Sequence, residues 1–154
     1  MIVKDYDLGF SFEISDEFTE ISRDKYSVFN VDDDTLHYFL YLDEESNEYP
    51  FAIIKGKKCE TIEEYEQQIV TEVNEFQNLY SEADVSPVLT IQVEGSRRLD
   101  RVSIDFKDGG YKTVVYFTYV GGHLVTASTS IESDADAYEG SVFKIFNSIK
   151  EMEN

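Results

Sequence analysis

Two histidines and one cysteine are the side chains in this sequence best suited to bind a metal ion or to act as a nucleophile. His37 lies within the stretch Leu36 to Leu42, and His123 follows the pair Gly121-Gly122. The histidines are far apart in sequence, and neither has a cysteine or an acid at ligand spacing. Because a zinc site normally needs three or four protein ligands, the sequence predicts no metal site.

Cys59 follows Lys57 and Lys58, whose positive charge favours the reactive thiolate form. Glutamates follow it at once, at positions 60, 63 and 64, and oppose that effect. A nucleophilic cysteine also needs a positioned base, and acid–base catalysis needs paired groups that nothing in the sequence positions. We therefore expect an ordinary thiol, no enzymatic activity and no cofactor.

Two runs of acidic residues flank the stretch Leu36 to Leu42 and form the candidate binding site. If their loops lie at the same end of a sheet, the carboxylates could gather around calcium, although the spacing and glycine of an EF-hand loop are missing. The alternatives are a solvated acidic loop and a contact surface for a basic partner. The candidate partner-binding residues are Asp32, Asp33, Asp34, Asp43, Glu44 and Glu45.

Acidic residues dominate the whole chain: 32 acids against 13 bases give a formal net charge of -19. Such a chain repels nucleic acid and anionic membranes, both of which are bound through several Lys or Arg contacts. It attracts basic proteins. We therefore expect a basic protein partner, no nucleic acid and no membrane, and the alternative is that the charge serves only solubility.

Two groups of basic residues stand out against this acidic background. Either they pair with neighbouring acids, which contributes roughly 0 to 1 kcal/mol per exposed pair, or an unpaired group binds an anionic ligand. The groups are Lys55, Lys57 and Lys58 on one predicted loop and Arg97, Arg98 and Arg101 on another.

Cysteine usage and the first residues bear on the cellular compartment. A single cysteine rules out an internal disulfide, so nothing requires an oxidising compartment. The start, Met1 to Asp7, lacks the basic segment and apolar run of a signal peptide, and no apolar stretch approaches about 20 residues. We expect a cytoplasmic protein.

The second half of the chain predicts a meander of strands that leads into a helix. Val88 to Glu94 and Arg101 to Lys107 alternate apolar and polar residues, as half-buried strands do. Tyr111 to Val120 is apolar on both faces, which predicts a central strand, and His123 to Ile131 follows a Gly-Gly turn. A helix then starts within residues 133–136. Its apolar stripe is Tyr138, Val142, Ile145, Ile149 and Met152.

The first half predicts strands followed by one helix. Leu8 to Ile14 alternates as a first strand, and clustered aspartates at 32–34 predict a hairpin between Tyr26 to Val31 and Leu36 to Leu42. A reversal over 43–50 leads to the short strand Phe51 to Ile54. Thr61-Ile62-Glu63-Glu64 is a capping box, which predicts the helix start. The apolar stripe of this helix is Ile62, Tyr65, Ile69, Val73, Phe76 and Tyr80.

The order strands, helix, four-strand meander, helix predicts an α+β sandwich in which helices pack on an antiparallel sheet. At 154 residues the chain suits a single domain, residues 1–154. A sheet edge left uncovered would allow a homodimer through strand pairing.

Three segments carry a family resemblance: Phe10 to Phe18, the helix start Thr61 to Tyr65, and the ending Phe143 to Lys150. In these the chain resembles the family of the PsbP extrinsic protein of photosystem II, the Mog-type Ran-binding nuclear import factors and the bacterial DcrB-like proteins. The family often has Pro and Trp in the early turn, where this chain has Ser15-Asp16 and Phe18. The resemblance implies a PsbP-like α/β/α sandwich without a shared active site.

Two functions remain open at this point. The resemblance implies a scaffold that binds other proteins, an adaptor or a chaperone-like module, and the acidic composition favours a basic partner. The alternative is a carrier of a small molecule or lipid, because 11 Phe and 11 Tyr residues could line a pocket between helix and sheet.

Overall fold

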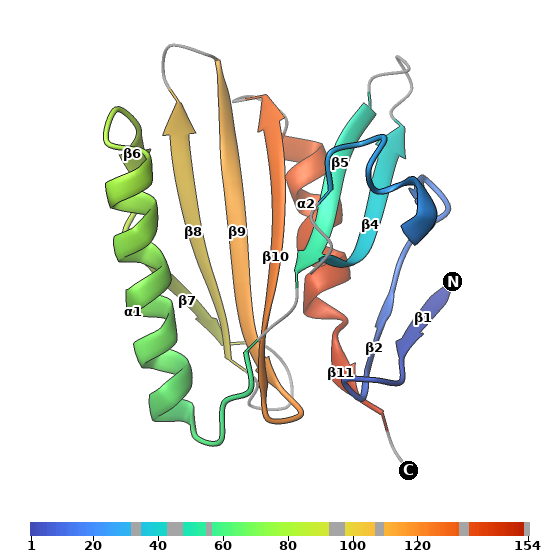
Figure 1. Cartoon of the computed structure of the whole chain (residues 1–154), viewed down its shortest axis with the longest axis horizontal. Coiled ribbons are helices and arrows are strands. Elements are labelled where there is room, and N and C mark those ends of the chain that lie inside the picture. The colour runs from blue at the N-terminus through green and yellow to red at the C-terminus, as the bar shows by residue number, and fades with distance from the viewer. Residues whose placement is uncertain are drawn as a thin grey trace.

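A computed structural model gives the structure of the chain and describes residues 1–31, 35–42, 48–54, 57–92, 98–106, 110–132 and 136–152. Its helices lie on either side of a large antiparallel sheet, and a small sheet of β1, β2 and β11 lies at one side (Figure 1). The helices are α1 (Ile62–Leu79) and α2 (Asp136–Asn147), with a short 3-10 helix η1 (Arg23–Lys25). The strands are β1 (Ile2–Asp5), β2 (Phe10–Glu13), β3 (Phe18–Glu20), β4 (Thr35–Leu42), β5 (Glu48–Ile54), β6 (Asp84–Val85), β7 (Leu89–Gln92), β8 (Arg98–Phe106), β9 (Tyr111–Val120), β10 (His123–Glu132) and β11 (Lys150–Glu151).

The large sheet has the strand order β3-β4-β5-β10-β9-β8-β6, with β7 also paired to β8. All of these pairs are antiparallel. The predicted meander is confirmed as β7, β8, β9 and β10, each paired to the next. The predicted α+β class with helices on an antiparallel sheet is confirmed as well.

Strand β9 shows how sequence determines the layers. Its alternate side chains enter two separate clusters of buried residues: Val114 and Tyr116 pack with α2, whereas Val115 and Phe117 pack with α1. All four side chains are buried. A strand that is apolar on both faces must lie between two helical layers, and the prediction that residues 111–120 form a central strand is confirmed.

Helix α1 begins where its capping box predicts. The Glu64 amide donates to the Thr61 hydroxyl at 3.2 Å, and the Glu64 carboxylate accepts from the Glu60 amide at 2.8 Å. Tyr65 and Ile69 are buried against the sheet. The last member of the predicted stripe, Tyr80, lies just beyond the helix as its C-cap.

The end of α2 differs from the prediction. The helix ends at Asn147, so the predicted stripe residues Ile149 and Met152 lie beyond it, and the intervening β11 pairs with β2. The Ser148 hydroxyl accepts from the Glu13 amide of β2 at 2.8 Å and donates to the Ile145 carbonyl at 2.6 Å. These bonds turn the chain away from the helix axis and towards the small sheet.

The predicted hairpin of residues 26–31 and 36–42 is wrong. Residues 26–30 form turns after η1, in which the Phe29 and Val31 amides donate to the Tyr26 carbonyl. Because these amides are satisfied locally, the segment does not pair with β4, which pairs with β3 and β5 instead. The first predicted strand, Leu8 to Ile14, is confirmed in part: the structure has the shorter strand β2 there. Strand β2 pairs with β1, a strand that the sequence pattern did not predict.

Candidate protein-binding surface

The six acidic residues predicted to bind a partner are Asp32, Asp33, Asp34, Asp43, Glu44 and Glu45, and they all lie outside the described residues. The structure therefore does not place them. Among the acids that the structure does describe, those around helix α1 stand out because no base is interspersed with them in the sequence.

The segment from Cys59 to Ser96, which contains α1, holds nine acids and no Lys, Arg or His. We call the exposed acids at and around the helix the acidic helix face. The apolar stripe of this helix does not reveal the acidic face. The absence of Lys, Arg and His from residues 59–96 is a signal in the sequence that could have found it. Its residues are Glu60, Glu63, Glu64, Glu66, Glu75, Glu82 and Asp84.

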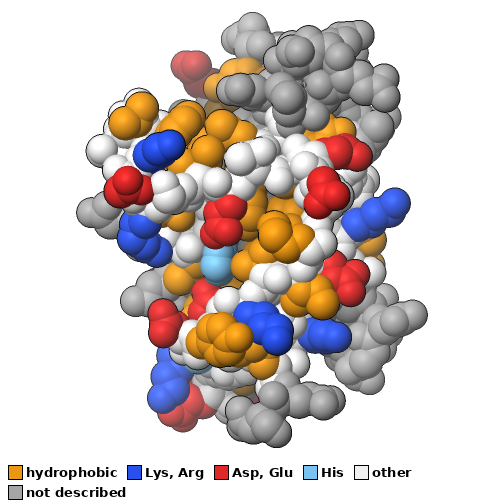
Figure 2. Space-filling model, turned by 90° about the vertical axis from the view of Figure 1, so that its right-hand side faces the viewer, with side chains coloured by type: hydrophobic (Ala, Val, Ile, Leu, Met, Phe, Trp, Pro, Cys, Tyr) orange, Lys and Arg blue, Asp and Glu red, His pale blue; other side chains and the backbone are white. Residues whose placement is uncertain are grey.

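Charge is mixed on the side of the molecule that carries β1 and β2, where acidic and basic side chains are interspersed (Figure 2). Residues 1–31 place exposed side chains of both signs here. They include Lys4, Arg23 and Lys25 alongside Asp7, Glu13 and Asp24. A single sign of charge is therefore a property of residues 59–96 and not of every part of the chain, and the exposed Lys57 and Lys58 directly precede this stretch.

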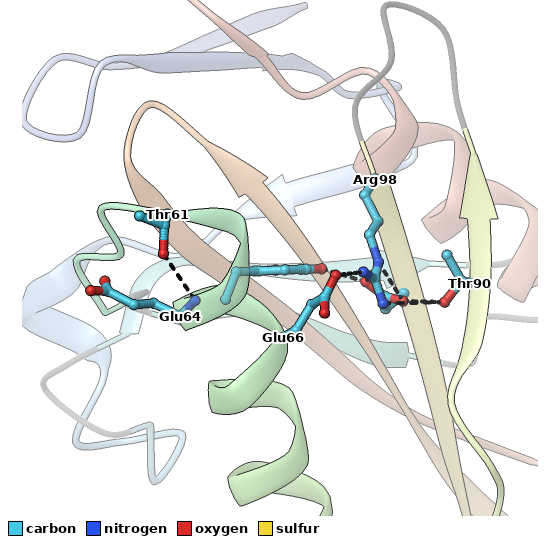
Figure 3. A network of polar contacts seen from close by, with 7 residues as sticks. Thr61, Glu64, Glu66, Thr90 and Arg98 are labelled. Atoms are coloured by element: carbon cyan, nitrogen blue, oxygen red, sulfur yellow. Dashed lines mark hydrogen bonds and ion pairs between the residues drawn. The ribbon is translucent and has the colours of Figure 1, made fainter.

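A polar network anchors α1 to the sheet beneath the acidic helix face (Figure 3). Its centre is Asp100 on β8, whose carboxylate is 0% exposed. It accepts from the Tyr65 hydroxyl at 2.7 Å, from the Thr90 hydroxyl at 2.7 Å and from Arg98 Nε at 3.0 Å. The Arg98 guanidinium also donates to Glu66 at 2.5 Å and lies over the Tyr65 ring. Every charge in the network has a partner.

The electrostatics of this network follow from burial and pairing. Burial raises the pKa of the Tyr65 hydroxyl well above its ordinary value, and its hydrogen bond to the Asp100 carboxylate adds to the rise. Burial opposes the charge on Arg98, but Asp100 and Glu66 outweigh that effect and raise the pKa of the guanidinium. The Tyr65 hydroxyl is therefore a neutral donor, and the charge of Arg98 is balanced by the carboxylates of Asp100 and Glu66. The network thus holds α1 in place and leaves no cation to bind an anion.

Arg98 and Arg101 were predicted on a loop, but both lie in strand β8, and Arg101 is paired as well. Arg101 donates to the Glu139 carboxylate of α2 through Nε at 3.1 Å and through a shorter contact from its Nη2. Lys112 lies 3.9 Å from the other oxygen of Glu139. The prediction that Arg98 and Arg101 pair with neighbouring acids is confirmed. Of the other predicted bases, Lys57 and Lys58 are exposed, and Lys55 and Arg97 lie outside the described residues.

Exposed rings gather where α1 ends. Tyr80 is 40% exposed and Tyr111 is 42% exposed. Both contact Phe106 at the end of β8: the Tyr80 and Phe106 ring centroids are 5.2 Å apart, and those of Phe106 and Tyr111 are 5.0 Å apart. We call these three residues the aromatic patch. The neighbouring Leu79 is 73% exposed.

The histidines and the cysteine lie in separate places. His37 lies between two carboxylates, with Nε2 3.0 Å from Asp5 and Nδ1 3.4 Å from Glu20. Cys59 is buried, which raises the pKa of its thiol, and the Glu64 charge raises it further. Across the described ranges, no group of three or more His, Cys, Asp or Glu side chains is arranged to hold a metal ion. No helix in the same ranges is long and apolar enough to cross a membrane.

A cavity of about 490 Å³ opens between α2 and the strands β1 and β2. Aromatic side chains are missing from its lining, so it does not match the aromatic pocket predicted for a ligand carrier. The core rings pack on one another instead: Tyr41 lies 5.0 Å from Phe18 and 4.9 Å from Tyr138 between centroids. The lining residues are Met1, Ile2, Glu13, Ile14, Ser15, Glu17, Ser141, Lys144 and Ile145.

Both ends of the large sheet are poorly suited to strand pairing. Strand β3 has three residues. At the other end β6 and β7 both pair with β8, and Ser86, Pro87 and Val88 interrupt them. Short edges and proline are devices that prevent edge-to-edge association. Homodimer formation through an edge stays a prediction, and these features weigh against it.

Together these features define a class: an α+β protein with a helix on either face of an antiparallel sheet and only negative charge on α1 and its flanking residues. Its fold is PsbP-like. It is similar to the solution structure of cyanobacterial PsbP (CyanoP) from Synechocystis sp. PCC 6803, with a TM-score of 0.65 and 12% sequence identity over 98% of this chain and 91% of that chain. This likeness shows the fold alone.

Other comparisons are less informative. A protein of known structure from Bacteroides thetaiotaomicron aligns with a TM-score of 0.47 and 10% identity over 99% of this chain and 48% of that chain, too distant to support an inference. Neither family models nor curated proteins match the chain. The PsbP-like fold implied by the resemblance is thus confirmed, whereas its Mog-type and DcrB-like parts stay predictions.

Proposed function

We propose that this protein is a non-enzymatic protein-binding module that receives a basic partner on the acidic helix face. The observation that carries the proposal is the single sign of charge from Cys59 to Ser96, on a helix whose outer face no other described element covers. A face of one sign attracts the opposite sign and speeds encounter with it, and it repels wrong partners.

The polar network supports binding over catalysis. A catalytic acid or base must reach the substrate. Asp100 and Tyr65 are buried and fully hydrogen-bonded within the fold, and Arg98 is held by two carboxylates. These groups fix α1 on the sheet, which gives a partner a rigid surface.

The experiment is a pull-down from a lysate of the source cell, with the purified protein as bait and mass spectrometry as the readout. It is done at about 0.05 M and about 0.5 M NaCl, which changes the electrostatic screening length several-fold. The test variant is Glu63→Gln/Glu75→Gln, which removes two exposed charges of the acidic helix face. The matched control is Asp7→Asn/Asp16→Asn, which removes the same charge from exposed positions outside α1.

We expect the wild type and the control to retain a basic partner at low salt and to lose it at high salt. The test variant should retain markedly less at low salt. Equal losses in both variants would mean that net charge alone matters, and capture that does not change with salt would overturn the proposal.

A further inference from the structure

We infer that the aromatic patch anchors this interface and takes arginine side chains from a segment of the partner protein. The inference rests on the proposed function and names the contact that the acidic helix face alone leaves unspecified. Exposed charge pairs contribute only about 0 to 1 kcal/mol each. A specific interface therefore also needs rings or arginines as anchors.

The three rings are held in place by different elements. Tyr80 is the C-cap of α1, and its amide donates to the Phe76 carbonyl at 2.9 Å. Phe106 ends β8, and Tyr111 begins β9 directly opposite it in register. The Phe106 and Tyr111 rings stack with an interplanar angle of 21°, and Tyr80 meets Phe106 at 90°. A partner therefore meets rings that are already ordered, which lowers the entropic cost of binding.

Exposure separates these rings from the core. Phe117, on the same face of the sheet under α1, is 0% exposed. Single exposed apolar residues are ordinary on a protein surface. Two tyrosines that each expose about two fifths of their surface and that both contact the same phenylalanine form one apolar surface instead, which is typical of interaction sites.

Charge decides what this surface accepts. Glu75 lies one helical turn before Leu79, and Glu82 follows Tyr80 by two residues; both are exposed. Lys112, the base next to Tyr111 in the chain, lies 3.9 Å from the Glu139 carboxylate of α2. Residues 107–109 lie outside the described residues, and the formal charges of Lys107 and Asp108 cancel. Ring faces attract cations, and a planar guanidinium also stacks on them, so arginine fits better than lysine.

The negative charge around the aromatic patch also excludes two other occupants. Where the structure describes the surroundings of the patch, an anionic ligand or membrane surface meets the carboxylates of Glu75 and Glu82, and the base beside Tyr111, Lys112, lies against Glu139. A second copy of the chain carries a net charge of -19 and is repelled. The occupant is therefore a cationic segment of another protein.

The test uses the full chain and a synthetic peptide in which three arginines alternate with leucine and glycine, titrated calorimetrically at about 0.05 M NaCl. The control peptide has neutral citrulline in place of each arginine. Tyr80→Leu/Tyr111→Leu keeps the apolar bulk and removes the ring faces, and Tyr6→Ala removes a 76% exposed tyrosine from the turn between β1 and β2. Circular dichroism checks that each variant is folded.

We expect Tyr80→Leu/Tyr111→Leu to weaken peptide binding about five- to twentyfold, the range expected for two cation–π contacts, and Tyr6→Ala to leave it unchanged. The citrulline peptide should not bind. If the arginine peptide fails to bind, or binds the leucine variant equally well, the inference is overturned, while the pull-down decides the proposed function separately. A dimer in sedimentation that disappears in the leucine variant would also overturn it.

Discussion

Asp100 illustrates how a buried charge is tolerated in this fold. An isolated buried carboxylate is very costly, whereas one that accepts several hydrogen bonds and faces a cation is not. Here three donors reach it from three places: α1, β7 and its own strand β8. Removing any one donor leaves the carboxylate under-satisfied, so the network should behave as a unit.

Tyr65→Phe removes one of these donors and is expected to lower the free energy of unfolding by about 1 to 3 kcal/mol. The pKa of Tyr65 is raised in the folded state, so its contribution is complete below the ordinary value of 10.0 and is lost as the pH rises above it, where the unfolded chain ionises first. Urea unfolding at neutral and alkaline pH should therefore show a smaller alkaline loss in Tyr65→Phe. Tyr6→Phe, at an exposed site, should match the wild type, and equal alkaline losses in all three proteins would contradict the assignment.

Cys59 gives a second prediction about a single residue. It is 3% exposed, and burial together with Glu64 raises the pKa of its thiol, so less thiolate is present at a given pH. Because the thiolate is the reactive form, iodoacetamide should label the native protein at least about tenfold more slowly than the chain unfolded in guanidinium chloride. Mass spectrometry follows the label, and native labelling as fast as that of the unfolded chain would show an accessible thiol.

At the scale of elements, the sequence predicted what local chemistry determines. The capping box at Thr61 set the start of α1, and the two-sided apolar pattern of residues 111–120 set the central strand. Pairing between distant segments was not predictable in this way. Strand β11 has two residues and so no periodicity, and β5 pairs with β10 across a long stretch of chain.

The candidate site was predicted less well than the fold. The acidic runs at 32–34 and 43–45 were visible in the sequence but lie outside the described residues. The aromatic patch joins Tyr80 to Phe106 and Tyr111, residues that belong to three elements, so only the folded sheet brings them together. The apolar spacing of the helix predicted Tyr80 as the last residue of its buried stripe, not as an exposed ring.

Thr61→Ala tests the capping box directly. It removes the hydroxyl that accepts from the Glu64 amide and should lower the free energy of unfolding by about 1 kcal/mol. Thr71→Ala is the matched control in the same helix: Thr71 is exposed and its hydroxyl donates to the Gln67 carbonyl. Alanine favours helix there, so this change should be neutral or stabilising by a few tenths of a kcal/mol, about the difference in helix propensity. Equal effects of the two substitutions in urea unfolding would show that capping contributes nothing.

At the scale of the whole molecule, net charge opposes folding while it serves binding. Thirty-two acids on a chain of 154 residues repel one another more strongly in the compact state than in the unfolded chain. Salt shortens the range of this repulsion, from about 30 Å at 0.01 M to about 8 Å at 0.15 M. The same screening weakens attraction to a basic partner, so salt should stabilise the fold and weaken the complex.

Thermal unfolding of the free protein measures the first of these effects. The midpoint should rise by about 2 to 8 °C as NaCl goes from about 0.01 to 0.15 M, equivalent to about 1 to 2 kcal/mol for a chain of this size. The combined variant Asp7→Asn/Asp16→Asn/Glu63→Gln/Glu75→Gln lowers the net negative charge by four, so its midpoint should be higher at low salt and rise less with salt. A midpoint that falls with salt would mean that ion pairs such as Arg98 with Glu66 and Arg101 with Glu139 outweigh the repulsion. In that case, loss of a partner at high salt in the pull-down could reflect a weakened fold, whereas a rising midpoint assigns that loss to the interface.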